Sequence, residues 1–131
     1  MFRFVVAVAA LSGCTSLRLA PEPLTGSWGG AHVGLTLDAA GGQLDYDCAA
    51  GTIAGSVMVD NTGQFSVTGT HTPGIGGPAR QGHVPPVFLA TYQGRVRGDA
   101  MMLSISVPAR DFMIGPYQLR RGADPNLVRC L

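Results

Sequence analysis

Hydrophobic and polar residues alternate with a period of two along most of this chain. Gly, Asp and Asn residues interrupt the alternation about every eight to twelve residues. Such spacing is typical of short strands joined by tight turns, and no segment shows a convincing helical period. The pattern therefore predicts an all-β protein. Its first two strands place on one face Val33, Leu35, Leu37, Leu44, Tyr46 and Cys48.

The clearest hairpin is expected where residues 87–97 and 100–107 flank Gly98-Asp99. Another turn is expected at residues 60–63, Asp-Asn-Thr-Gly, because Asn and Gly tolerate the positive φ of tight turns. Strands are expected before and after it, at residues 53–59 and around Phe65 and Val67. A later strand is expected at about 117–120, and residues 127–130 are a candidate for a short eighth one.

Seven or eight short antiparallel strands fit a single small domain. Closing such a sheet on itself removes the unpaired edges that favour aggregation. We therefore expect a small up-and-down β-barrel, with a β-sandwich as the alternative.

Two ends of this expected sheet carry a further signal. The first strand opens on Gly26-Ser27-Trp28, and Arg120 and Arg121 lie near the end of the last regular strand. This arrangement resembles the G-x-W motif and late arginine of lipocalin and avidin-like barrels. The resemblance implies that an arginine covers the tryptophan.

The N-terminus has the order of an export signal. Arg3 precedes an apolar run at residues 4–10, and Leu11-Ser12-Gly13-Cys14 follows. The run is too short to span a bilayer, which requires about 20 apolar residues. The last four residues resemble the lipobox of bacterial lipoproteins. The resemblance implies acylation of Cys14 and removal of residues 1–13. The alternative is an ordinary secretory signal cut near Ala20.

We expect the protein to be located in the cell envelope and to contact the membrane through the lipid on Cys14. By the same resemblance, Thr15 indicates the outer membrane, facing the periplasm. Residues 14–24 contain Pro21 and Pro23 and no apolar period, so we interpret them as a tether. Residues 25–131 then form a single β domain.

Size and charge narrow the function. The chain has 131 residues, a hydrophobic content of 46% and a formal charge of +1. This length excludes a two-domain enzyme, and the near-neutral balance argues against a nucleic acid partner.

The cysteines are consistent with export. If Cys14 carries lipid, Cys48 and Cys130 remain as an even pair in an oxidising compartment. We predict that they form a disulfide, which would close a loop of roughly 80 residues and restrain the C-terminus. Two buried free thiols are the alternative.

The longest segment not expected to be a regular strand is 71–86, and long loops in compact domains are often functional. It contains His71, Arg80 and His83, which together with Tyr92 are the candidate residues for a ligand or partner site. A purely connecting loop is the alternative. The spacing of the two histidines fits no familiar zinc pattern, so no metal site is expected.

No catalytic group stands out. The chain has no lysine and no G-x-S-x-G motif. Residues 74–79 formally match G-x-G-x-x-A, but Pro78 and the lack of a following helix argue against a dinucleotide site. The only local group of acids is Asp38, Asp45 and Asp47, which we interpret as solvated. We therefore expect a non-enzymatic protein without a cofactor.

Two functions remain. The first is an envelope lipoprotein whose barrel binds a small apolar ligand or an envelope component. The second is an inhibitor of a secreted hydrolase, because residues 46–51 and the C-terminal cysteine resemble small barrel lipoproteins that inhibit lysozyme. A cavity lined by Phe65, Phe88 and Tyr92 would favour a small ligand, whereas a filled barrel with a projecting 72–86 loop would favour a protein partner.

Overall fold

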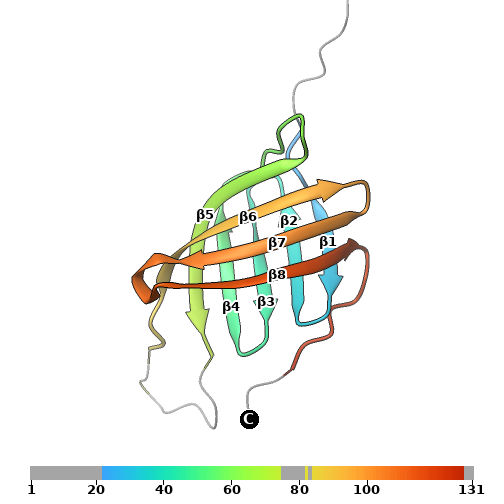
Figure 1. Ribbon diagram of the computed structural model, residues 1–131. Coiled ribbons are helices and arrows are strands. Elements are labelled where there is room, and N and C mark those ends of the chain that lie inside the picture. The colour runs from blue at the N-terminus through green and yellow to red at the C-terminus, as the bar shows by residue number, and fades with distance from the viewer. Residues whose placement is uncertain (1–21, 75–81, 83, 129–131) are drawn as a thin grey trace, which may run out of the picture.

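The computed structural model describes residues 22–74, 82 and 84–128, which fold into a closed β-barrel (Figure 1). Each strand pairs with the next one in the chain, always antiparallel, and β8 pairs with β1 to close the wall. The predicted up-and-down barrel is therefore confirmed, in its eight-stranded form. The strands are β1 (Gly26–Gly30), β2 (Val33–Asp38), β3 (Gly41–Tyr46), β4 (Ala49–Ala54), β5 (Gln64–Pro73), β6 (Phe88–Arg97), β7 (Ala100–Val107) and β8 (Phe112–Arg121).

Some strand boundaries differ from the predicted ones in the first half of the chain. Cys48 lies in a turn with φ of 56°, so β3 ends at Tyr46 rather than continuing through the cysteine. The strand expected at residues 53–59 lies earlier, as β4, and the chain turns at Gly55 with φ of 98°.

Others differ in the second half. Segment 71–86 was expected to hold no regular strand, but β5 continues to Pro73 because His71 pairs with Phe88 of β6. The strand expected at 117–120 is the longer β8. The short strand expected at 127–130 does not form at its described residues 127 and 128, and the rest of it lies outside the described residues. The described helical structure is one 3-10 turn, Pro108–Arg110.

The inward-facing residues of the alternation fill the barrel as one cluster. Polar and small residues between them face outward, as a pleated strand requires. Burial of this set is the main source of stability expected for so small a domain. The buried hydrophobic residues are Trp28, Val33, Leu35, Leu37, Leu44, Tyr46, Ile53, Val57, Phe65, Ala90, Tyr92, Met101, Leu103, Ile105, Val107 and Leu119.

The barrel has two unequal walls. β1–β4 have five or six residues each and form what we call the back wall. β5–β8 have eight to ten residues each and form the front wall. In Figure 1, β6, β7 and β8 cross in front of the back wall at a steep angle, and β5 bends to follow both layers. At Gly69, β5 pairs with both Ile53 of β4 and Ala90 of β6, so it joins the two walls.

One end of the barrel is closed by Trp28, which is buried. The Arg121 guanidinium lies over the indole, 4.3 Å from the ring centroid. It also donates a hydrogen bond to the Thr25 carbonyl at 2.9 Å and pairs with Asp99 at 3.5 Å. The expected contact between a late arginine and the tryptophan is therefore present, and Arg121 makes it. We call this end, where the described chain begins, the closed end.

After β8 the chain folds back across the outside of the back wall. A Cβ added at Gly29 would lie 2.1 Å from the Ala123 oxygen, and one at Gly34 would lie 2.8 Å from the Pro125 Cβ. Asn126 then forms a parallel bridge with Ala31. The two glycines thus leave room for the tail (residues 122–128) to lie flat on the wall and reach the opposite end, which we call the mouth.

Candidate functional site

The mouth end of the barrel interior holds a small polar network. His71 is only 3% exposed, and its ring stacks on Tyr46 with centroids 5.6 Å apart. The Tyr46 hydroxyl is hydrogen-bonded to Nδ1 of His71. Beside them, the Tyr92 hydroxyl donates to the Thr70 carbonyl at 2.5 Å. Gly51 provides the space, because a Cβ there would lie 2.0 Å from the Tyr92 oxygen.

The electrostatics of this network favour its neutral form. Burial, and secondarily the charge of Arg110, lowers the pKa of His71 below its ordinary value. Burial raises the pKa of Tyr46, and neighbouring Tyr92 raises it further. A neutral His71 can accept the Tyr46 O–H proton in a hydrogen bond at Nδ1. We therefore interpret the network as a satisfied polar contact within the core.

Aromatic rings cover His71 toward the mouth. Phe112 meets the imidazole edge-on at 5.9 Å, and Phe88 lies at 6.5 Å. Arg110, in the 3-10 turn, stacks over Phe88 at 5.2 Å. Because these groups cover it, His71 is not presented to a ligand. Across the described ranges, no three residues among His, Cys, Asp and Glu are grouped to hold a metal ion.

The rim of the mouth carries a second polar pair. His32, in the turn after β1, contacts the Asp47 carboxylate through Nδ1. The other oxygen of Asp47 accepts a hydrogen bond from the Val128 amide at 2.7 Å. The Asn126 carbonyl also accepts the His32 N–H at 2.7 Å. Asp47 therefore fixes the tail against the rim, directly beside Cys48.

The residues predicted as a ligand or partner site do not form one surface. His71 and Tyr92 lie inside the barrel, where Tyr92 is fully buried. Arg80 and His83 fall outside the described residues, as do Cys14 and Cys130. Of the candidate residues in segment 71–86, only His71 is described, and it lies in β5 with its side chain facing inward.

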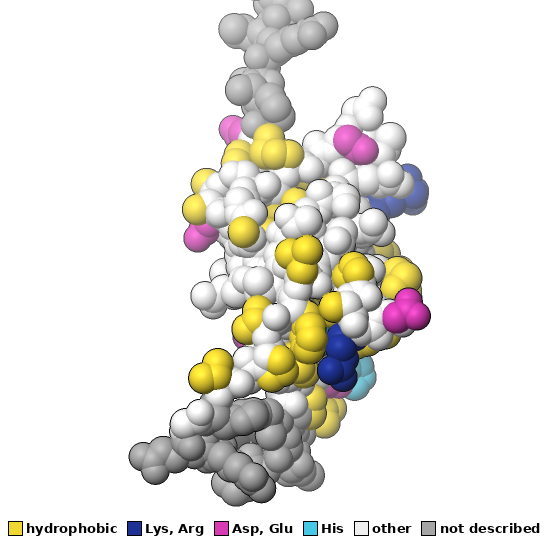
Figure 2. Space-filling model, turned by 90° about the vertical axis from the view of Figure 1, so that its left-hand side faces the viewer, with side chains coloured by type: hydrophobic (Ala, Val, Ile, Leu, Met, Phe, Trp, Pro, Cys, Tyr) yellow, Lys and Arg dark blue, Asp and Glu magenta, His cyan; other side chains and the backbone are white. Residues whose placement is uncertain are grey.

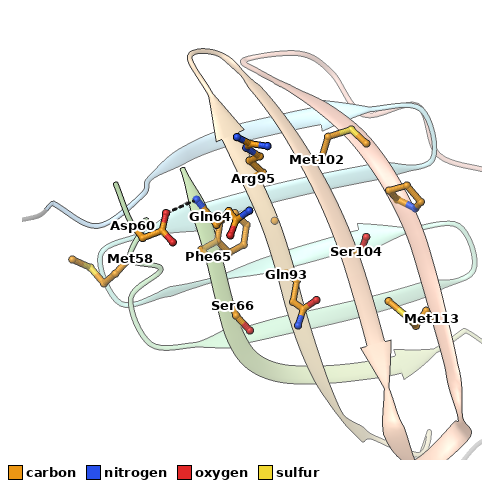
Figure 3. Close-up of a pocket in the computed structure, with 12 residues that line it drawn as sticks. Met58, Asp60, Gln64, Phe65, Ser66, Gln93, Arg95, Met102, Ser104 and Met113 are labelled. Carbon is orange, nitrogen blue, oxygen red and sulfur yellow. Dashed lines mark hydrogen bonds between the residues drawn. The ribbon is translucent and has the colours of Figure 1, made fainter. Parts of the chain in front are cut away.

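The hollow of greatest chemical interest lies outside the barrel, on the front wall. We call it the wall groove; it has a volume of about 700 Å³. Figure 3 shows Ser66, Gln93 and Ser104 projecting from three neighbouring strands, with Gln64 and Arg95 beside them. Cross-strand register explains this, because Ser66 pairs with Gln93 and Gln93 with Ser104. Met58, Met102 and Met113 add apolar sides.

Asp60 stands at one end of the wall groove. One of its carboxylate oxygens accepts hydrogen bonds from the Thr62 hydroxyl and amide and from the Gln64 amide, at 2.6, 2.8 and 2.9 Å. These bonds, first that of the Thr62 hydroxyl, lower the pKa of Asp60. The groove thus has a fixed negative charge at one end and the positive charge of Arg95 within it.

Sequence reasoning did not identify these groove residues. The alternation places Gln64, Ser66, Gln93 and Ser104 on the outer face, but it does not give the register between β5, β6 and β7. That register brings the four side chains together. An unusual run of uncharged polar residues facing outward was the available signal.

Several apolar side chains are exposed near the mouth. Val84 is 83% exposed, Leu89 68% and Met113 67%. Figure 2 shows hydrophobic side chains gathered in the lower part of one face, next to residues that are not described.

Comparison with known proteins gave no match: no family model, no curated protein and no solved structure is similar to this chain at a significant level. In the described part of the chain, no helix has the length and apolar character needed to cross a membrane. The site must therefore be interpreted from its own geometry.

Proposed function

We propose that this protein is a non-catalytic, lipid-anchored binding module of the cell envelope whose outer wall, rather than its interior, binds an envelope component. The observation that supports this proposal most directly is that the barrel interior is filled, whereas a groove is open on its outer wall. Phe65 and Tyr92 are buried and Phe88 packs against the same core. Tyr92 and Phe88 fill the barrel interior, and Phe65 lies between that core and the wall groove, which is open to solvent.

The side chains of the wall groove indicate the ligand class. Gln64 and Gln93 offer amide donors and acceptors, Ser66 and Ser104 offer hydroxyls, and Arg95 can bind a carboxylate. Such a set fits an extended polar chain that bears amide, hydroxyl and carboxyl groups. The glycan strands of the cell wall have this chemistry, and we propose them as the ligand.

The expected disulfide agrees with the position of the tail. Val128 bonds to Asp47, which directly precedes Cys48, and Cys130 is two residues beyond Val128. A bond between Cys48 and Cys130 would therefore need no rearrangement of the described chain. Such a bond, once formed, would support an exported location, since disulfides persist in oxidising compartments.

Cosedimentation with purified peptidoglycan tests the binding proposal. We expect the full chain to bind, and Gln93→Ala to weaken binding about fivefold or more, as the loss of a hydrogen-bonded contact predicts. Thr52→Ala, an outward-facing change on the back wall, is the matched control and should bind as the wild type does. Equal binding by both variants would refute the wall groove as the site. Inhibition of lysozyme without glycan binding would favour the inhibitor function instead.

The intact mass of the protein, extracted from host membranes without reductant, tests the anchor and the disulfide together. We expect residues 14–131 plus acyl chains, minus two hydrogens. A mass without lipid that begins after Cys14 would mean a secreted soluble protein and would refute the anchor.

A further inference from the structure

A second groove crosses the seam where β8 meets β1, on the same front face. We call it the seam groove; its volume is about 720 Å³. Strand register places Arg97, Ala100, Arg120 and Gly29 side by side across β6, β7, β8 and β1. Arg95 lies two residues before Arg97 and thus faces the same side. The groove therefore has three arginines at its walls.

The arginine charges of the seam groove are not neutralised by the rest of the described structure. Arg121 is held by Asp99 and by Trp28 at the closed end. Arg95, Arg97 and Arg120 form no ion pair with any described residue. Unpaired guanidinium groups at the surface are available for phosphate, which they bind through two parallel N–H donors.

The floor between the arginines is small and partly apolar. Neighbouring strands are about 4.8 Å apart, so Arg97 and Arg120, two strands apart, start about 10 Å from each other. Only Ala100 lies between them, and the long side chains can therefore reach one anionic group above it. Met102, 42% exposed, lies beside this row.

The seam groove lies at the same end as the tether. Arg121, next to Arg120, donates to the carbonyl of Thr25, where the expected tether ends. A lipid on Cys14 would bring this end of the barrel toward the bilayer, since eleven extended residues reach at most about 40 Å.

The opposite wall has the opposite charge. Residues 26–54, which form β1–β4 and their turns, carry Asp38, Asp45 and Asp47 and neither lysine nor arginine. An anionic surface would repel the back wall and attract the front wall, so the charges also define an orientation.

We propose that the seam groove docks the anchored domain on the membrane by binding phosphate groups of anionic phospholipids. This inference rests on the proposed lipid anchor. A basic patch beside the lipid adds a second, electrostatic attachment to the anionic surface. Docking would present the wall groove at a fixed height and orientation above the bilayer.

Energy transfer tests the docking. Trp28 is the only tryptophan and lies at the closed end, so it reports the distance of that end from dansyl-labelled headgroups. The full chain is reconstituted with vesicles of phosphatidylcholine, and with vesicles containing phosphatidylglycerol at 30% as well. We expect stronger transfer on the anionic vesicles, reversed by added salt.

Arg120→Gln should shift the ratio of docked to undocked protein about fivefold toward undocked, from roughly 1 kcal/mol per arginine at such a surface. Arg97→Gln should shift this ratio by a similar factor. Arg110→Gln removes the same charge at the mouth and should leave transfer unchanged. Equal transfer on both vesicle types, or an equal loss in Arg110→Gln, would overturn the docking site.

Flotation of the same samples separates the two proposals. Association with neutral vesicles reports the anchor alone, because no anionic lipid is present. If the chain floats only with anionic vesicles, and through Arg97 and Arg120, the anchor proposal fails and the docking site stands. If it floats with neither, both fail.

Discussion

The two walls of this barrel share one core but use their outer faces differently. The back wall has short strands, and the tail lies across it at Gly29 and Gly34. The front wall has longer strands, and its outer face carries the two grooves. The additional length of the front strands therefore provides surface rather than core.

This difference indicates where structural and functional constraints lie. On the back wall, glycines allow close approach of the chain to itself, and any side chain there would displace the tail. On the front wall, outward residues such as Gln93 and Arg97 touch little and can be changed without loss of fold. The following predictions test this division, from the largest effect to the smallest.

The tail should make the largest contribution to the free energy of unfolding if the Cys48–Cys130 disulfide forms. Closure of a loop of roughly 80 residues is expected to stabilise the protein by about 4–5 kcal/mol. Reduction should therefore lower the midpoint of urea unfolding strongly. An unchanged midpoint after reduction, verified by thiol counting, would show that the tail is held only by its contacts to Asp47 and Ala31.

The next effect concerns the junction of the two walls, where Tyr92 of the front wall lies against Gly51 of the back wall. Gly51→Ala should cost about 3 kcal/mol of unfolding free energy, because the new methyl group would lie 2.0 Å from the Tyr92 oxygen. Adding Tyr92→Phe removes that oxygen and should restore part of the loss. Additive effects in this double-mutant cycle would contradict the contact. Ala50→Ser, exposed on the same strand, is the control.

A smaller effect separates two adjacent arginines of β8. Arg121→Ala removes the contact with Trp28 and the bond to Thr25, and should cost about 1–2 kcal/mol. Arg120→Ala should leave stability nearly unchanged, since Arg120 has no ion pair among the described residues. Thermal unfolding of both variants measures the difference. Equal losses would mean that Arg120 has a structural role and would weaken its assignment to a binding surface.

The sequence predicted the barrel well because period-two alternation directly reports which side chains face inward. Val33, Leu35 and Leu37 are buried as expected, and so are Met101, Leu103 and Ile105. Strand ends were predicted less well. Pro73 belongs to a strand because it pairs with Ala49, and Phe112 because it pairs with Val107 across the 3-10 turn. Alternation contains no information on either pairing.

The candidate sites were predicted poorly for the same reason. His71 was assigned to a loop by the prolines and glycines that follow it, but pairing with Phe88 extends β5 and turns the imidazole inward. In the seam groove, Arg95 and Arg97 are separated from Arg120 by more than 20 residues in the chain. The register of β6, β7 and β8 places Arg97 and Arg120 on one surface, with Ala100 between them. Contact between the late arginine and Trp28 was the long-range feature that a motif could predict.

The smallest effect tests whether His71 belongs to the core rather than to a site. Its pKa is lowered in the folded protein, mainly by burial, whereas the unfolded chain titrates near the ordinary value of about 6.5. Just below that pH the unfolded state binds more protons, so the free energy of unfolding should fall as the pH decreases from 8 to 5. His71→Gln keeps an acceptor for the Tyr46 hydroxyl and does not titrate.

The variant should therefore show a flatter dependence of stability on pH over this range. His32 is present in both proteins, so their difference isolates His71. The range also stays above the region where Asp60, whose pKa is lowered, loses its charge. A slope equal to that of the wild type would mean that the imidazole reaches solvent in the folded state. The mouth, rather than the front wall, would then become the first place to look for a ligand.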